Sequence, residues 1–322
     1  MYKVLFVGEK WAACNPKFGL SNVHHNFIGS LSSTGLAEIQ TFFYDMYVHE
    51  THQLCDAALL EKCRLERPDF LILRLVRGTD LNPSLEILGK IRQQTTAKIV
   101  SIHSDTHDQF AADWMNDVSR HVDLIVVQDC YSVYPKHISE TGSFIDLWTP
   151  QDPSVFHPPD ADDRSIDVSF MGRVDRYTDR KLFIGMLQQH GITVVQKGGV
   201  GEQQFSIDAY ANHLRQSRIA LNFSRPVFDE PNHHCKGRTV ETTLCGALLM
   251  EQENPETKKW FRPGVDYVAY TNERDLVAKV DYYLSHEQER RRIAEHGHMT
   301  ASKLYSADQY WRAVFDRMAQ NE

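Results

Sequence analysis

The chain has 322 residues, of which 42% are hydrophobic and 24% charged, and its formal net charge is −8. This composition is typical of a globular protein, and the length allows two domains that each bury a core. No apolar run approaches the ~20 residues of a membrane-spanning helix. The run before Gly8 is too short for a signal peptide, so we expect a cytoplasmic location. Six cysteines without a CxxC spacing favour reduced thiols.

The negative charge also bears on the choice of partner. No long run of lysine or arginine interleaves with aromatic residues. A nucleic-acid acceptor is therefore disfavoured, although a local basic cleft can lie on an acidic protein. The sequence leaves the oligomeric state open.

The first half of the chain alternates short apolar runs with longer segments of helical length. We expect strands at residues 2–7, 39–44, 69–75, 98–102, 122–127 and 143–147. We expect helices at 51–66, 83–94, 110–120 and 131–140. Such alternation predicts an α/β fold in which helices cover a parallel sheet, with one doubly wound domain over residues 1–152.

A segment at 149–165 with four prolines and four aspartates predicts a domain boundary. The alternation then resumes in a second domain over residues 153–305. We expect its strands at 166–171, 192–196, 218–223, 247–251 and 267–270, and helices at 175–190 and 207–216. The helical tail, 273–317, should break near Ser285, Gly297 and Ser306. Its last piece, 306–322, is a candidate to join the first domain.

The most informative stretch is 232–250, NHHCKGRTVETTLCGALLM. Lys236, Gly237 and Arg238 open a short helix that continues through Thr239 and Glu241, and Gly246 should end it. A helix N-terminus attracts anions, and lysine and arginine would add charge for a diphosphate. Glu241, about one turn further on, would accept hydrogen bonds from two sugar hydroxyls. The stretch therefore predicts a site for a nucleoside diphosphate.

The competing interpretation of this stretch is a basic loop before an ordinary core helix, with Glu241 solvated or bound to the helix dipole. The stretch lacks the glycine spacing of a P-loop or a Rossmann fingerprint. The residues alone leave both interpretations open.

Polar residues follow several other expected strands, where ligands of open α/β sheets bind. They are Gly8, Glu9 and Lys10, then His103, Asp105 and His107, then Gly172 and Arg173, and finally Asn222 and Ser224. If the two sheets face each other, these groups converge on the space between them. Turn chemistry alone also favours such residues, so each loop has a purely structural alternative.

Four segments carry a resemblance to a known family: 167–187, 217–226, 236–252 and 261–297. In this order they resemble the C-terminal half of the glycosyltransferases related to the spore maturation protein CgeB. The first half agrees more loosely, through KIVSIHSDTHD and the strand DLIVVQ. The resemblance implies the GT-B fold, in which two Rossmann-like domains face each other across a cleft and the second holds most of the donor.

The resemblance also implies roles for single residues. Glu241 stands where the family binds the nucleotide ribose, and Gly172 with Arg173 matches the loop near the donor phosphates. Lys236 and Arg238 match the basic pair before the helix; the other donor-side candidates are Asn222, Ser224, His233, Gly237 and Thr239. Many retaining members carry a second glutamate where this chain has His233. This departure argues against a retaining mechanism of that type.

Sugar transfer with inversion needs a base for the acceptor hydroxyl, and the resemblance places that base in the first domain. Asp105 is the first choice; His103, His107 and Glu9 are the other candidates, and Gly8 to Lys10 form the expected acceptor loop. Side chains and a helix N-terminus usually neutralise the diphosphate in this family, so we expect neither metal nor cofactor. The pair His103 and His107 and the run His233 to Cys235 lack metal-site spacing.

Three classes of function follow from the sequence. The first is a glycosyltransferase that moves a sugar from a nucleotide sugar to an unidentified acceptor hydroxyl. The second is another sugar-nucleotide enzyme, such as an epimerase, for which the sequence shows no distinguishing motif. The third is a GT-B protein that binds a nucleotide or a partner without chemistry. The residues name neither the donor base and sugar nor the stereochemistry.

Overall fold

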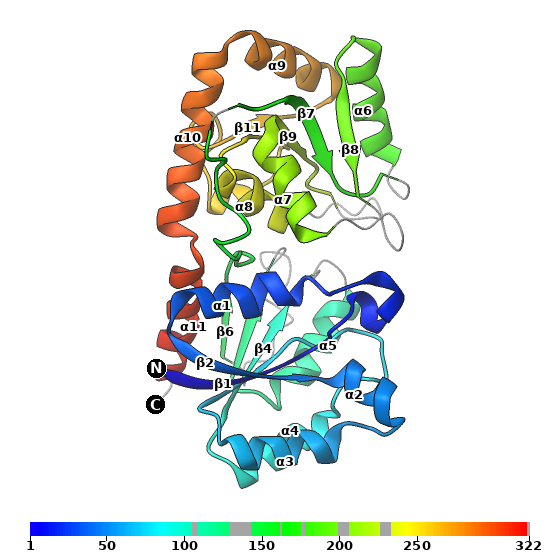
Figure 1. Ribbon diagram of the computed structural model, residues 1–322, viewed down its shortest axis with the longest axis vertical. Coiled ribbons are helices and arrows are strands. Elements are labelled where there is room, and N and C mark those ends of the chain that lie inside the picture. Colours follow the sequence, from blue (N-terminus) through cyan, green and yellow to red (C-terminus); the bar gives the residue numbers. More distant parts are fainter. Residues whose placement is uncertain are drawn as a thin grey trace. The chain divides into compact units, whose positions relative to one another are not determined.

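The computed structural model describes residues 1–104, 109–128, 143–161, 163–174, 178–198, 206–225 and 233–320. The chain divides into two compact units. Unit 1 comprises Met1–Asp152 and Ala307–Glu322, and unit 2 comprises Pro153–Ser306. Each unit has its own sheet and its own core (Figure 1).

Unit 1 contains a six-stranded sheet in the order β2-β1-β3-β4-β5-β6, and every pairing in it is parallel. The strands are β1 (Tyr2–Gly8), β2 (Ala37–Phe43), β3 (Phe70–Leu73), β4 (Lys98–His103), β5 (Leu124–Val127) and β6 (Ser143–Asp146). The central strands are buried along their whole length, as expected for a sheet covered on both faces. The six strands predicted for this half are confirmed.

Helices cover both faces of this sheet (Figure 1). They are α1 (Ser30–Thr34), α2 (Tyr44–Thr51), α3 (Asp56–Glu66), α4 (Leu85–Gln94), α5 (Gln109–Ser119) and α11 (Ala307–Ala319), with a π-helix at His24–Gly29 and 3-10 turns at Ala12–Cys14 and Pro16–Phe18. The C-terminal α11 packs beside α1, and the Trp311 ring nitrogen donates to the Ser30 hydroxyl at 3.0 Å. Cys55 and Cys63 lie in the core of this unit.

One helix of unit 1 differs from the sequence-based expectation. The segment 51–66 was expected as a single helix, but α2 ends at Thr51 and α3 begins only at Asp56. His52, the C-cap residue of α2, adopts a left-handed conformation with φ of 57°, and this conformation ends the α-helix. The helix expected at 131–140 lies outside the described residues.

Unit 2 contains a five-stranded parallel sheet in the order β11-β10-β9-β7-β8. Its strands are β7 (Ile166–Met171), β8 (Val194–Lys197), β9 (Ser217–Asn222), β10 (Leu248–Gln252) and β11 (Val268–Tyr270). Its helices are α6 (Thr178–Gln189), α7 (Ile207–Gln216), α8 (Gly237–Leu244), α9 (Glu273–Ser285) and α10 (Glu287–Leu304), with a 3-10 turn at Thr257–Lys259. The strands predicted for this half are confirmed.

Two glycines of unit 2 are predicted to interrupt helices, and the structure confirms only one of these predictions. Gly246 adopts φ of +67° directly after the C-cap of α8, so it ends that helix as predicted. The predicted break at Gly297 is wrong, because Gly297 lies inside α10. A Cβ there would come within 2.3 Å of the Asp266 carbonyl oxygen, so this glycine allows close packing of α10.

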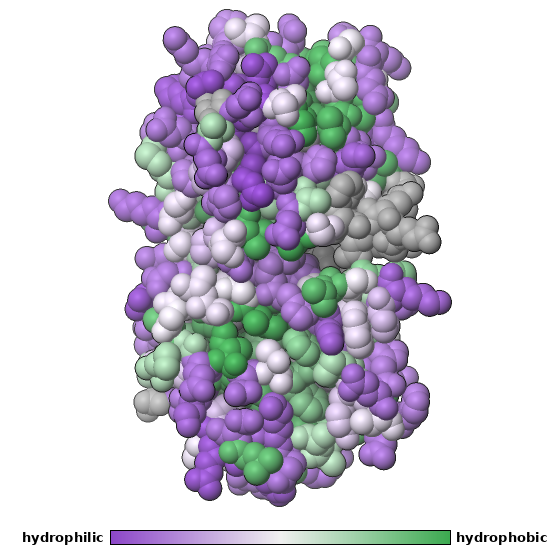
Figure 2. Space-filling view, viewed as in Figure 1, coloured by the Kyte–Doolittle hydropathy of each residue, from purple (hydrophilic) through white to green (hydrophobic). Residues whose placement is uncertain are grey.

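The surface shown in Figure 2 displays hydrophobic side chains in separate groups among hydrophilic ones. Within the described ranges, no helix is long and apolar enough to cross a membrane. No disulfide joins the five cysteines that the structure describes, and Cys130 lies outside that part of the chain.

Candidate functional site

The predicted helix start lies at the carboxyl edge of the unit 2 sheet. β9 ends at Asn222, and α8 begins at Gly237 after Lys236, whose extended backbone has φ of −77° and ψ of 150°. No side-chain cap is formed on Lys236, the N-cap residue. The Thr239 N–H donates to the Lys236 carbonyl at 2.9 Å. The N–H groups of Gly237 and Arg238 therefore keep hydrogen-bonding capacity and partial positive charge for an anion.

Arg238 is held in place by acceptors from two strand ends. Its Nε donates to the Met171 carbonyl at 2.6 Å, and its Nη1 donates to Asn222 Oδ1 at 2.8 Å. The guanidinium carbon lies 5.1 Å from the centre of the Phe170 ring. This half-buried cation is thus oriented by the protein itself, and a ligand would not have to order it.

Gly172 makes room for this arginine. A Cβ on Gly172 would lie 2.7 Å from Arg238 Nη2 and 2.9 Å from the Phe170 ring. The Gly172 N–H donates to the Lys197 carbonyl at 2.7 Å, and Gly198, with φ of +118°, packs against the Gly172 backbone. The two glycines therefore bring the ends of β7 and β8 close to the guanidinium.

Arg173 follows directly, and its carbonyl accepts a hydrogen bond of 2.8 Å from Arg180 Nη1. Arg180 is buried, and its guanidinium lies between 5 and 6 Å from the ring centres of Phe170 and Phe223. The loop that was predicted to approach the donor phosphates is thus anchored by a second arginine.

Glu241 lies one turn into α8 and is buried. Its Oε2 accepts a hydrogen bond of 2.5 Å from the Tyr210 hydroxyl, which α7 supplies. Burial and the neighbouring Glu241 raise the pKa of Tyr210 well above its usual value, so the phenol stays protonated. Tyr210 was not predicted as a site residue, and its long-range contact leaves no local signal in the sequence.

Lys236, His233 and Ser224 lie in or next to the segment that leads into α8. Lys236 Nζ donates to the Arg225 carbonyl at 3.0 Å and contacts the His234 ring. His233 Nδ1 lies 2.7 Å from the Ser224 hydroxyl. Burial, with the nearby charges of Arg225 and Lys236, lowers the pKa of His233, which favours its neutral form.

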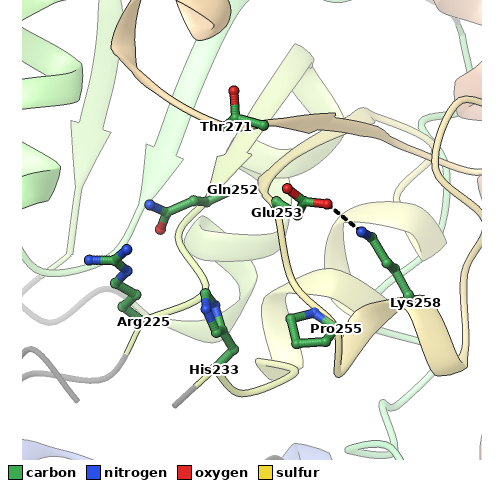
Figure 3. A pocket seen from close by; sticks show the side chains of 7 residues that line it. All are labelled: Arg225, His233, Gln252, Glu253, Pro255, Lys258 and Thr271. Carbon is green, nitrogen blue, oxygen red and sulfur yellow. Dashed lines mark hydrogen bonds and ion pairs between the residues drawn. The ribbon is translucent and has the colours of Figure 1, made fainter. Parts of the chain in front are cut away.

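A cavity of about 380 Å³ opens beside His233 (Figure 3). Its lining residues are Arg225, His233, Gln252, Glu253, Pro255, Lys258 and Thr271. Two of these residues, Glu253 and Lys258, form an ion pair with each other. Amide, hydroxyl, carboxylate and cationic groups together suit a ligand that carries several hydroxyls.

The candidate acceptor loop of unit 1 is largely tied to its own unit. Glu9 is buried and accepts hydrogen bonds from Ser21 at 2.8 Å and Tyr44 at 3.4 Å. Burial raises its pKa, which the Arg74 charge partly offsets. The backbone N–H of Lys10 donates to Asp45 at 2.8 Å. Gly8 is the last residue of β1.

His103 ends β4 and is buried, with its Nε2 3.0 Å from the Ser101 hydroxyl. Burial, followed by the charges of Arg74 and Arg77, lowers its pKa to about 3. Its ring is therefore neutral at ordinary pH. Asp105 and His107 lie outside the described residues, so the position of the catalytic base stays a prediction.

Seven of the predicted donor residues of unit 2 fall into two groups. Gly172, Asn222, Thr239 and Arg238 form the first, in which Asn222 Nδ2 donates to the Thr239 hydroxyl at 3.1 Å. Ser224, His233 and Lys236 form the second, next to the cavity. Across the described ranges, no three histidine, cysteine, aspartate or glutamate side chains form a group that could hold a metal ion.

Comparison with known proteins agrees with this geometry. Residues 175–316 match a family model described as glycosyl transferase-like. This match covers most of unit 2, including all of α8. The chain carries a glycosyltransferase-like domain. No curated protein matches the chain by sequence.

Several solved structures are similar to this one over nearly the whole chain. HepE of Anabaena, solved with UDP and glucose, has a TM-score of 0.68 at 12% identity, with 98% of this chain and 100% of that chain covered. Sucrose-phosphate synthase of Thermosynechococcus elongatus has a TM-score of 0.67 at 10% identity, with full coverage of both chains. An α-glucosyltransferase solved with UDP and DNA has a TM-score of 0.66 at 10% identity and 99% coverage of both chains. These similarities show the GT-B fold.

Proposed function

We propose that this chain transfers a sugar from a nucleoside diphosphate sugar to an acceptor hydroxyl, with the donor bound by unit 2. The observation that carries the proposal is the fixed guanidinium of Arg238 at the start of α8, one turn from the buried carboxylate of Glu241. A charged fork and a helix N-terminus suit a diphosphate, and a carboxylate suits ribose hydroxyls. A nucleoside diphosphate carries both a diphosphate and ribose hydroxyls.

The donor has a direction along this edge of the sheet. The nucleoside would lie near Glu241 and Tyr210, and the diphosphate would lie over the N-terminus of α8, between Arg238 and Lys236. The transferred sugar would extend past His233 into the cavity, where Gln252 and the Glu253–Lys258 pair offer partners for its hydroxyls. This layout uses both groups of predicted donor residues.

UDP is the nucleotide we propose. HepE and the α-glucosyltransferase, which share this fold, were both solved with UDP. We propose further that no metal ion is needed, because Arg238, Lys236 and the α8 dipole supply positive charge to the leaving diphosphate.

The acceptor side of the proposal rests on unit 1. Asp105 is the proposed base, since its loop follows β4 at the carboxyl edge of that sheet. The acceptor is a hydroxyl compound of unassigned class. Within the glycosyltransferases of this fold, we place the chain nearest to the enzymes related to CgeB, on the four sequence segments that resemble them.

A panel of UDP, GDP, TDP, ADP and CDP in a thermal-shift assay tests the donor site. We expect UDP to raise the melting temperature most, because only the folded site binds it. Slow hydrolysis of a UDP-sugar, abolished in Arg238→Ala and Glu241→Ala, would distinguish an enzyme from a nucleotide-binding protein without chemistry. Conversion of the sugar without its release would instead indicate an epimerase. No shift with any of the five nucleotides would contradict the proposal.

A further inference from the structure

Glu251 is a buried carboxylate at the carboxyl end of the sheet, on β10. It has no exposed surface. Its Oε1 accepts hydrogen bonds from Asn222 Nδ2 at 2.9 Å and from Asn254 Nδ2 at 3.1 Å. The Thr239 hydroxyl lies 3.5 Å from the same oxygen. Oε2 has no hydrogen-bond partner in the part of the chain that the structure describes. Burial of a carboxylate among uncharged donors costs free energy, so its presence calls for an explanation.

Each of these donors belongs to a segment of the donor site. Asn222 ends β9, and Thr239 lies in the first turn of α8. Asn254 Nδ2 also donates to the His234 carbonyl at 3.0 Å, two residues before Lys236. A single carboxylate oxygen therefore joins three segments that carry the predicted donor-binding groups.

The Asn222 amide links Glu251 to the guanidinium of Arg238. Its nitrogen donates to Glu251 and Thr239, while its oxygen accepts from Arg238 Nη1 at 2.8 Å and from the Phe223 N–H at 3.1 Å. The two ends of an amide differ, so an acceptor at position 251 selects this orientation. In the flipped orientation the amide NH₂ would point at the guanidinium, and two donors would face each other.

We propose that Glu251 is a positioning residue of the donor site, which orients Asn222 and through it keeps the Arg238 guanidinium directed at the leaving diphosphate. This inference rests on the proposed function of the site. Only Oε1 is used as an acceptor, so the role needs the shape and oxygen of the side chain rather than its charge. Glutamine keeps both, and leucine keeps the approximate size without the acceptor.

The affinity for UDP, measured by calorimetry, tests this role. We expect Glu251→Leu to weaken UDP binding by about 10-fold, as for the loss of one oriented charged contact, and Glu251→Gln to stay within about 3-fold of the wild type. Glu256→Gln is the matched control, because Glu256 is also a buried glutamate but pairs with Lys259 at 2.5 Å. If Glu251→Gln binds UDP as weakly as Glu251→Leu, the proposed positioning role is wrong.

A double-mutant cycle separates positioning from general damage. In the Arg238→Ala background, Glu251→Leu should weaken UDP binding by less than about 2-fold more, because the group it positions is already gone. An undiminished 10-fold loss in that background would overturn the inference. Should Glu251→Leu fail to fold, Asn222→Ala cuts the same link and must give the same loss and the same non-additivity.

Melting temperatures measured without nucleotide distinguish this inference from the proposed function. If the wild type does not bind UDP, the proposed function fails, but the shifts caused by Glu251→Leu and Arg238→Ala should still be non-additive. Additive shifts would show that the two side chains are not coupled, and would contradict the positioning role whatever the protein binds.

Discussion

The two units present polar groups at the carboxyl edges of their sheets in different ways. In unit 2, Arg238 is fixed by strand-end acceptors at the start of a helix that no side chain of the described residues caps. In unit 1, Glu9 and His103 are buried, bond to side chains of their own unit, and have pKa values shifted toward the neutral forms. The proposed anion site of unit 2 thus uses a fixed cation, whereas Glu9 and His103 at the strand ends of unit 1 favour their neutral forms. Donor affinity should therefore depend on unit 2, and turnover should depend on both units.

The largest effect is expected from Arg238→Ala. Loss of a fixed guanidinium at the developing diphosphate charge should lower kcat/KM for the UDP-sugar by about 10³-fold. Steady-state kinetics measure this loss. Arg218→Ala is the matched control, because Arg218 lies near the start of β9, at the opposite end of that strand from Asn222, and pairs with Asp167. A loss below about 3-fold in Arg238→Ala would remove the main support for a donor site in unit 2.

Asp105→Asn tests the contribution of unit 1 to turnover. If Asp105 is the base, kcat should fall by about 100-fold while the Kd for UDP stays unchanged. Asp117→Asn, at an exposed ion pair with Arg120, controls for the loss of one unit 1 carboxylate. A parallel loss of UDP affinity in Asp105→Asn would show that donor binding does not depend on unit 2 alone.

Gly172→Ala tests the close approach of β7 to Arg238. The added methyl would lie 2.7 Å from Nη2, so the guanidinium must move, and UDP affinity should fall by about 10-fold in calorimetry. Gly185→Ala lies on α6, where a Cβ meets no atom within 4 Å. It should leave affinity unchanged and raise the stability by about 0.5–1 kcal/mol. Equal affinities in both variants would contradict the account of Gly172.

The last prediction concerns stability rather than activity, and its pH dependence. Burial raises the pKa of Glu251 from 4.5 to about 7, although the hydrogen bond from Asn254 and the charges of Lys236 and Arg238 oppose this shift. The folded state therefore binds a proton more tightly than the unfolded state, and the contribution of Glu251 to stability is full below pH 4.5 and falls as the pH rises toward 7. The loss is of the order of 3 kcal/mol.

Denaturant unfolding between pH 4.5 and 8 checks this prediction. The difference in unfolding free energy between the wild type and Glu251→Gln should shift in favour of the variant as the pH rises. A difference that stays constant over this range would show that the carboxyl group does not titrate there.

Much of the fold could be predicted from the sequence, because its strands are apolar runs bounded by turn residues and its helix ends carry local signals. Gly246 is an example, since a glycine after a helical run leaves few alternatives. The predicted helix break at Gly297 is wrong for the opposite reason. Gly297 is needed because the Asp266 carbonyl of another segment packs against it, and no local pattern in the sequence shows that contact.

The same distinction holds for the candidate site. Lys236, Arg238 and Glu241 stand together in one stretch, so the sequence could mark them as a group. Tyr210 and Glu251 reach that stretch only through tertiary contacts, with Tyr210 on another helix and Glu251 buried on the next strand. Residues that position other site residues are thus harder to predict from the sequence than residues that would contact the ligand.

A crystal structure of the protein with UDP tests the central claim most directly. We predict diphosphate oxygens within hydrogen-bond distance of Arg238 and of the first N–H groups of α8, and ribose hydroxyls on the carboxylate of Glu241. UDP bound elsewhere, with Arg238 and Glu241 still bonded only to their protein partners, would contradict the account.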